Sequence, residues 1–191
     1  MSAGSLWKRT GQGKRRWLAG VVALLALTAC EQGAAPDRLL EGGAFPSLAL
    51  PRFDGGQTAL SEWRGKLVIL NLWATWCAPC RAELPSLDRL AARLDPERFA
   101  VLGLSVDSEI DIAREFLAER AVRHARFEYI DRDQRISREI LQVRAYPITF
   151  IIDPHGKLLR RILGERDWDR PEVVAALEAA WAGDPQALSH L

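Results

Sequence analysis

The chain has 191 residues, of which 48% are hydrophobic, and its 26 basic and 25 acidic side chains give a formal net charge of +1. Five of the basic residues and none of the acidic residues precede Cys30, so the 162 residues that remain carry 21 basic and 25 acidic side chains. This mildly acidic balance argues against a nucleic-acid partner, and the length suits one domain with a buried core.

Residues 1–29 have the pattern of a signal peptide. Five basic residues form its charged flank: Lys8, Arg9, Lys14, Arg15 and Arg16. The apolar run Leu18–Ala29 follows, and its 12 residues are too few to span a bilayer. The run ends in Leu-Thr-Ala-Cys30, which resembles the lipobox of bacterial lipoproteins, so we predict that Cys30 is lipidated after cleavage. A plain signal anchor or secretory signal is the alternative, and either one predicts an extracytoplasmic, periplasmic domain.

The next segments predict a tether and then the first strands. Residues 30–41 are small, polar and proline-containing, which is typical of a tether, and they precede a domain at 42–185 and a tail at 186–191. Residues 45–60 alternate weakly around the turn Asp54-Gly55-Gly56, which predicts a β-hairpin. The nearly continuous apolar run Leu67–Trp73 predicts a strand buried on both faces.

A pair of cysteines follows this strand at the start of a predicted helix. In Trp76-Cys77-Ala-Pro-Cys80 the two thiols stand three positions apart, so they can close a disulfide across one helical turn. The N–H groups at a helix start favour the thiolate of Cys77, which predicts that Cys77 is the nucleophile and Cys80 the resolving thiol. Such a pair needs no cofactor.

Two simpler roles for the cysteine pair are disfavoured. A zinc site requires four ligands at local spacings, but the sequence has no second cysteine pair and its three histidines are scattered at His124, His155 and His190, so we predict no metal. A purely structural disulfide that closes so small a loop gains little chain entropy. Apart from Cys30, the pair leaves no odd thiol.

Residues 77–94 predict a helix with one apolar face. The stripe comprises Leu84, Leu87, Leu90, Ala91 and Leu94. Pro85 interrupts this pattern and is expected to kink the helix, at a cost of roughly 3 kcal/mol unless the surroundings compensate. Glu83 lies one turn beyond Cys80 on the same face, so its carboxylate can approach the dithiol.

The rest of the chain alternates strands and helices. The predicted elements are a strand at 99–106, a helix capped by Ser108 and Asp111 that carries Ile112, Phe116 and Leu117, a strand at 126–130, a helix carrying Ile136, Ile140 and Leu141, strands at 147–152 and 157–163 around the turn 153–156, and a helix at 170–181.

The run Asn-Leu-Trp-Ala-Thr-Trp-Cys-Ala-Pro-Cys-Arg-Ala-Glu-Leu-Pro at 71–85, together with the segment Tyr146–Asp153, resembles the thioredoxin superfamily. Within it, the sequence is similar to the membrane-anchored TlpA/ResA-type thiol–disulfide oxidoreductases, from about Phe45 to Leu177. The resemblance implies an α/β thioredoxin fold with a central mixed β-sheet flanked by helices. It also implies an N-terminal β-hairpin extension, shared with peroxiredoxins, and a central β-α insertion.

Three residues are predicted to bind the substrate, two of them from the resemblance and Trp76 from its place beside Cys77. Tyr146-Pro147 resembles the cis-proline loop that faces the dithiol in this superfamily, and it leaves the backbone of residue 146 free to pair with an extended peptide. Tyr146 departs from the small or aliphatic residue common at that place. Trp76, next to the nucleophile, is expected to cover the site and contact partners, whereas Trp73 is expected to pack in the core.

The resemblance also assigns a role to Glu83. Thioredoxins have a buried, titratable aspartate where this sequence has Asn71, so proton handling must move elsewhere. ResA-like proteins carry a glutamate that matches Glu83, which implies a raised pKa and a part in proton transfer to Cys80. A first-turn glutamate also stabilises a helix N-terminus, and this second role stays open.

The resemblance implies a reductase of protein disulfides. Its partners would be cysteine-containing protein substrates, such as apocytochrome c or copper-site assembly proteins, a membrane thiol–disulfide electron donor, and the membrane itself through the lipid anchor. A peroxiredoxin-like peroxidase would have proline seven and threonine or serine three residues before its cysteine, but Cys77 has Leu70 and Ala74 there. A non-catalytic peptide-binding module would not require both thiols.

Overall fold

The computed structural model describes residues 39–191. In chain order its elements are β1 (Ala49–Pro51), β2 (Gln57–Ala59), η1 (Leu60–Trp63), β3 (Leu67–Trp73), α1 (Ala78–Arg93), β4 (Phe99–Ser105), α2 (Ile110–Glu119), β5 (Arg126–Ile130), η2 (Arg135–Ile140), β6 (Ile148–Ile152), β7 (Leu158–Leu163), α3 (Pro171–Trp181) and η3 (Pro185–Leu188). The predicted signal peptide at 1–29, the predicted lipidation site Cys30 and the tether up to residue 38 lie outside the described residues.

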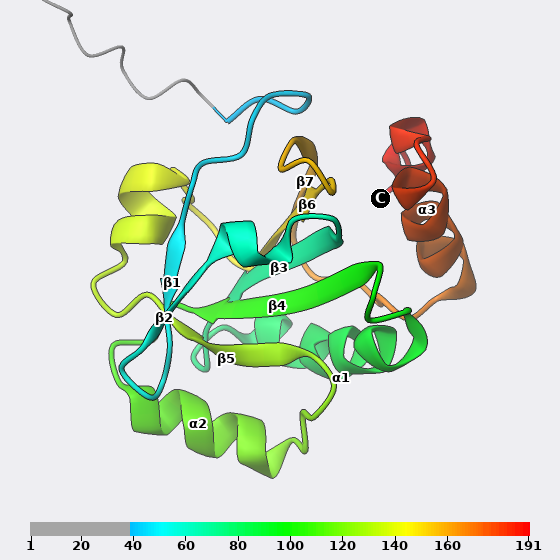
Figure 1. Ribbon diagram of the computed structural model, residues 1–191. Helices are drawn as coiled ribbons and strands as arrows, with labels where there is room; N and C mark the ends of the chain where they lie inside the picture. Colours follow the sequence, from blue (N-terminus) through cyan, green and yellow to red (C-terminus); the bar gives the residue numbers. More distant parts are fainter. Residues whose placement is uncertain (1–38) are drawn as a thin grey trace, which may run out of the picture. The chain divides into compact units, whose positions relative to one another are not determined.

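Five strands form one mixed sheet in the order β5-β4-β3-β6-β7 (Figure 1). β3 pairs in parallel with β4 and antiparallel with β6, so it occupies the centre of the sheet. All seven residues of β3 are buried, as its continuous apolar run predicts. The predicted hairpin is present as the antiparallel pair β1–β2. These findings confirm the predicted α/β class with a central mixed sheet.

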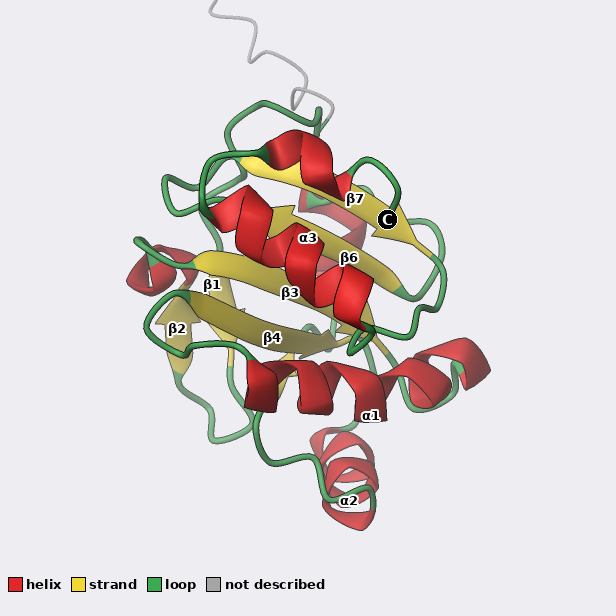
Figure 2. Cartoon of the chain, turned by 90° about the vertical axis from the view of Figure 1, so that its right-hand side faces the viewer, coloured by secondary structure: helices red, strands yellow, loops and turns green. Residues whose placement is uncertain are grey.

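The α-helices cover one face of the sheet, and the hairpin and η2 lie on the other. Figure 2 shows α1 and α3 in front of β3, β4 and β6. The predicted apolar stripe of α1 and its C-cap packs against this face. Its buried members are Leu84, Leu87, Leu90 and Leu94, and Ala91 is half-buried. On the opposite face, Leu48 and Leu50 next to and within β1 pack with residues of β3, β6 and η2. β3 is therefore covered on both faces.

The start and the buried face of α2 differ from the prediction. The N-cap residue is Glu109 and makes no side-chain capping bond, so the prediction that Ser108 caps this helix is wrong. The backbone carbonyl of Ser108 instead accepts a hydrogen bond from Arg132. Leu117 is buried and Phe116 packs against the core, as predicted. Ile112 is 53% exposed and its neighbour Ala113 is buried instead, so the prediction that Ile112 belongs to the packed stripe is wrong.

The predicted helix after β5 is a short π-helical segment, η2. The buried carboxylate of Asp131 accepts the backbone N–H groups of Ile136 at 3.1 Å and Ser137 at 2.7 Å. These bonds give hydrogen-bond acceptors to free N–H groups in the first turn of η2. Ile136 and Leu141 are buried, as the sequence predicts, and Ile140 is half-buried.

The C-terminal segment packs against the domain. At the C-terminus, Leu188 of η3 is fully buried in the cluster that contains α3. No helix within 39–191 has both the length and the apolar character needed to cross a bilayer.

Candidate active site

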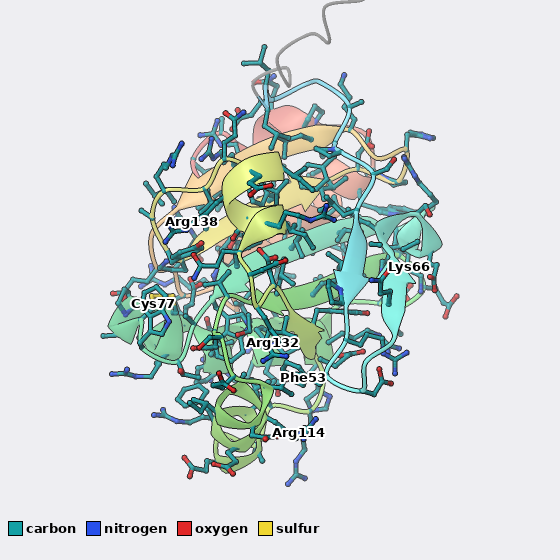
Figure 3. The ribbon with its side chains drawn as sticks, turned by 90° about the vertical axis from the view of Figure 1, so that its left-hand side faces the viewer. Phe53, Lys66, Cys77, Arg114, Arg132 and Arg138 are labelled. Atoms are coloured by element: carbon teal, nitrogen blue, oxygen red, sulfur yellow. A yellow bond between two sulfur atoms is a disulfide. The ribbon has the colours of Figure 1, made fainter. Side chains whose placement is uncertain are left out.

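The dithiol lies where the central strand passes into α1. Figure 3 places Cys77 at the opposite end of the domain from Lys66, which precedes β3. Cys77 is the N-cap residue of α1, is 6% exposed and is joined to the fully buried Cys80 by a disulfide of 2.04 Å. The backbone N–H of Cys80 also donates to Sγ of Cys77 at 3.3 Å. Cys77 is therefore the more accessible of the two cysteines.

A buried carboxylate fixes the loop that leads into the dithiol. Oδ1 of Asp107 accepts the hydroxyl of Thr75 at 2.7 Å, and Oδ2 accepts its backbone N–H at 3.1 Å. The hydroxyl of Ser105 donates to the same carboxylate at 2.7 Å. From the helix side, Nη1 of Arg81 donates to the carbonyl of Thr75 at 2.9 Å. The loop is thus held from β4 and from α1.

An aromatic pair lies beside the cysteines. Trp76 is 60% exposed, and its ring meets that of Tyr146 edge-on at a centroid distance of 5.9 Å. The Tyr146–Pro147 peptide bond is cis, as predicted. Among residues 39–191, the backbone N–H and C=O of Tyr146 make no backbone hydrogen bond, whereas the carbonyl of Pro147 accepts from Gly164 at 2.9 Å. Trp73, as expected, is fully buried in the core.

Glu83 is buried at the centre of a polar network. Oε1 of its carboxylate accepts Nδ2 of Asn71 at 2.7 Å, and Oε2 accepts Nε1 of Trp168 at 2.9 Å and the backbone N–H of Arg166 at 3.1 Å. The hydroxyl of Ser86 accepts the backbone N–H of Trp168 at 3.0 Å. The segment before α3 is therefore bound to α1 at two successive turns.

Burial raises the pKa of Glu83 from its usual 4.5 to about 7. The hydrogen bonds from Trp168, Asn71 and Arg166 oppose this rise, and the nearby charge of Glu165 adds to it. The raised pKa agrees with what the resemblance implies. The first turn of α1 contains no acidic residue, so the alternative of a first-turn glutamate at the helix N-terminus is wrong.

Sequence reasoning missed three polar partners in the site: Thr75, Asp107 and Trp168. Thr75 and Asp107 each lie two residues beyond the ends of β3 and β4, which are parallel neighbours in register. Because the carboxyl ends of adjacent parallel strands meet at one edge, this symmetry could have identified Asp107. Trp168 stands alone among charged residues at 165–170, and its large apolar ring was the available signal that this segment returns to the core.

The histidines and the acidic residues of the described chain form no cluster of metal ligands. Within the described range, no three His, Cys, Asp or Glu side chains lie close enough together to hold a metal ion. His124 and His155 are exposed in loops.

Comparison with known sequences gives a consistent family. The sequence model of the AhpC/TSA family matches residues 42–161. The thiol-disulfide oxidoreductase ResA of Bacillus thuringiensis (strain Al Hakam) is 30% identical over 167 residues, which cover 83% of this chain and 94% of that protein. ResA of Bacillus subtilis (strain 168) is 27% identical over 131 residues, which cover 69% of this chain and 72% of that protein.

Solved structures show the same architecture. A Chlorobium tepidum protein named thiol:disulfide interchange protein DsbE superposes with a TM-score of 0.63 at 28% identity, covering 76% of this chain and 99% of that one. The thioredoxin domain of a Bacteroides vulgatus thiol-disulfide oxidoreductase superposes with a TM-score of 0.61 at 20% identity, covering 74% and 98%. These likenesses confirm the predicted thioredoxin fold.

Proposed function

Because the chain belongs to the AhpC/TSA family and is a ResA-like thiol–disulfide oxidoreductase, we propose that it reduces disulfides of extracytoplasmic proteins through Cys77 and Cys80. The observation that carries the proposal is the dithiol itself. One sulfur belongs to a slightly exposed N-cap residue and the other is fully buried one turn into α1. A target can therefore reach Cys77 and not Cys80.

Two exchange steps transfer two electrons to the target. The Cys77 thiolate attacks one sulfur of a target disulfide, so a mixed disulfide forms and the other target sulfur leaves as a thiolate. Cys80 then loses its proton and attacks Sγ of Cys77. The mixed disulfide breaks, the second target sulfur leaves, and the Cys77–Cys80 disulfide forms. The target is now a dithiol, and the protein holds the disulfide seen in the structure.

Glu83 is the proposed carrier of the Cys80 proton. It lies one helical turn beyond Cys80, and a carboxyl group with a pKa of about 7 can both accept and release a proton near neutral pH. It accepts the proton when Cys80 attacks, and it returns a proton when the disulfide is reduced again.

Trp76, Tyr146 and Pro147 are the proposed contacts for the target. The backbone of Tyr146 can pair with an extended segment that carries the target disulfide, in the manner of an added strand. The exposed ring of Trp76 offers apolar contact area next to Cys77. The ring of Tyr146 packs against that of Trp76. It therefore limits the size of the target side chains that can bind beside the dithiol.

The proposal includes a location and partners. Lipidation of Cys30 would hold the domain at the periplasmic face of a bacterial membrane, with residues up to 41 as the tether. In an oxidising compartment a reductase must be recharged, which calls for a membrane thiol–disulfide electron donor. Cysteine pairs of apocytochrome c or of copper-site assembly proteins are the proposed substrates.

Trapping of the mixed disulfide tests the chemistry. The probe is an oxidised peptide with the Cys-X-X-Cys-His sequence that attaches c-type haem. Cys80→Ala should accumulate a covalent adduct that a small thiol releases, whereas Cys77→Ala should form none. Reduction of the probe at the wild-type rate by the double variant Cys77→Ala/Cys80→Ala would refute the proposal in favour of a binding module.

A redox titration tests the direction. A reductase should have a potential nearer that of thioredoxin, ~ −270 mV, than that of a strong oxidant such as DsbA, ~ −120 mV. A value near the second figure would reverse the direction that we assign.

A further inference from the structure

The three N–H groups around Glu83 are divided unequally between its two oxygens. Oε2 accepts two of them, from Arg166 and Trp168, whereas Oε1 accepts only Nδ2 of Asn71. Each carboxylate oxygen has two lone pairs, so both pairs of Oε2 are in use. A proton that neutralises Glu83 is therefore placed on Oε1, the oxygen that faces Asn71.

The amide of Asn71 is suited to a charged Glu83. Its Nδ2 carries two hydrogens, one directed to Glu83 and the other to the hydroxyl oxygen of Thr149 at 2.9 Å. Its Oδ1 is buried and has no hydrogen-bond partner within residues 39–191. Most buried side-chain polar atoms have a partner, so this unused acceptor calls for an explanation.

Protonation of Glu83 reverses what the Oε1 position requires. The acid O–H needs an acceptor, but the groups that contact the carboxylate in the structure are all donors: Nδ2 of Asn71, Nε1 of Trp168 and the backbone N–H of Arg166. A half-turn of the amide exchanges Oδ1 and Nδ2 within almost the same volume. Oδ1 could then accept both the O–H of Glu83 and the hydroxyl of Thr149, with one lone pair for each. One amide atom lacks a partner in either orientation.

We propose that Asn71 is a positioning residue for proton transfer at Glu83: its amide donates to the carboxylate and turns over to accept from the carboxylic acid. The proposal rests on the proposed role of Glu83 as the proton carrier. An aspartate at position 71 could not do this, because it would lack the two hydrogens and would place a second negative charge beside Glu83.

Other groups near Glu83 do not replace this function. Cys80 lies one turn back on α1, and Thr149 on β6 contributes a hydroxyl that does not titrate. From the segment before α3, Glu165 acts only through its charge, and Arg166 contacts the carboxylate through its backbone N–H. Asn71 is thus the side chain at Oε1 that can change from donor to acceptor.

Nuclear magnetic resonance on the full chain in its disulfide form tests the proposal, since neither cysteine titrates in that form. The carboxyl carbon of Glu83 should titrate with a midpoint near pH 7. The side-chain NH2 resonances of Asn71 should move with the same midpoint. This measurement needs no substitution and so does not depend on whether a variant folds.

Two variants sharpen the test. Asn71→Leu removes a donor to the charged carboxylate and should raise the Glu83 midpoint by about one pH unit, a tenfold change in proton affinity. Ser137→Ala is the matched control, because the buried Ser137 hydroxyl donates to the backbone carbonyl of Gln134 before η2 and to none of the groups that contact Glu83. Its midpoint should equal that of the wild type.

Two results would overturn the role of Asn71 while leaving Glu83 as the proton carrier. One is a set of Asn71 NH2 resonances that stay fixed while Glu83 titrates. The other is an Asn71→Leu midpoint equal to that of the wild type. Failure of the proposed function is seen in a different experiment, in which Glu83→Gln leaves the pH profile of disulfide reduction unchanged.

Discussion

Replacement of Glu83 by glutamine should remove a pH-dependent loss of stability. The pKa of this carboxyl rises from 4.5 to about 7 on folding, because burial desolvates it. Between these two values the folded state binds more protons than the unfolded state. The stabilisation of the protonated form is therefore complete below about pH 4.5 and is lost as the pH rises through 7. At about 1.4 kcal/mol per tenfold change in proton affinity, the loss is about 3 kcal/mol by pH 8.

Urea denaturation between pH 4 and pH 8, followed by tryptophan fluorescence, measures this loss in the disulfide form. The wild type should lose about 3 kcal/mol more than Glu83→Gln across this range, because the neutral amide does not titrate. Asp169, whose pKa is lowered to about 2 mainly by the hydrogen bond from Arg89, loses its stabilisation only as the pH falls below the window. Glu115→Gln on α2 is the exposed control, because Glu115 does not act on the pKa of Glu83. Equal pH dependence in the wild type and Glu83→Gln would refute the reasoning.

Three further outcomes are expected. Trp168→Phe removes the Nε1 donor to the Glu83 carboxylate, so it should cost about 1–3 kcal/mol more at pH 8 than at pH 4 in the same urea assay; an equal cost at both pH values would contradict this. Gly103→Ala would place a Cβ atom 2.1 Å from Cδ1 of Phe127, so thermal unfolding should show a loss of about 1–3 kcal/mol, and an unchanged midpoint would contradict the packing. Cys30→Ser should abolish incorporation of radiolabelled palmitate in producing cells, and persistent labelling would exclude lipidation at Cys30.

Local signals in the sequence predicted most of the fold. The apolar run at 67–73 contains enough residues to identify a strand buried on both faces, and the glycines at 55 and 56 mark the hairpin turn. The stripe of α2 could not be settled in this way, because Ile112 and Ala113 begin two overlapping apolar faces. The face of α2 that packs against the core carries Phe116, whose ring lies at a centroid distance of 5.9 Å from the buried ring of Trp73. That contact joins residues far apart in the sequence.

The sequence by itself determined the dithiol, its place after the central strand and the presence of an acid one turn from Cys80, because each depends on residue type and short spacing. The cis-proline loop was implied by the resemblance to the thioredoxin superfamily. Only the tertiary structure decided the environment of that acid. Asn71 comes from β3, and Arg166 and Trp168 come from the segment before α3, so they contact Glu83 only when the sheet and α1 have packed. Thr149 of β6 contacts Asn71 in the same packed core. A pKa depends on desolvation and on the donors within hydrogen-bond distance, and both are properties of the assembled core.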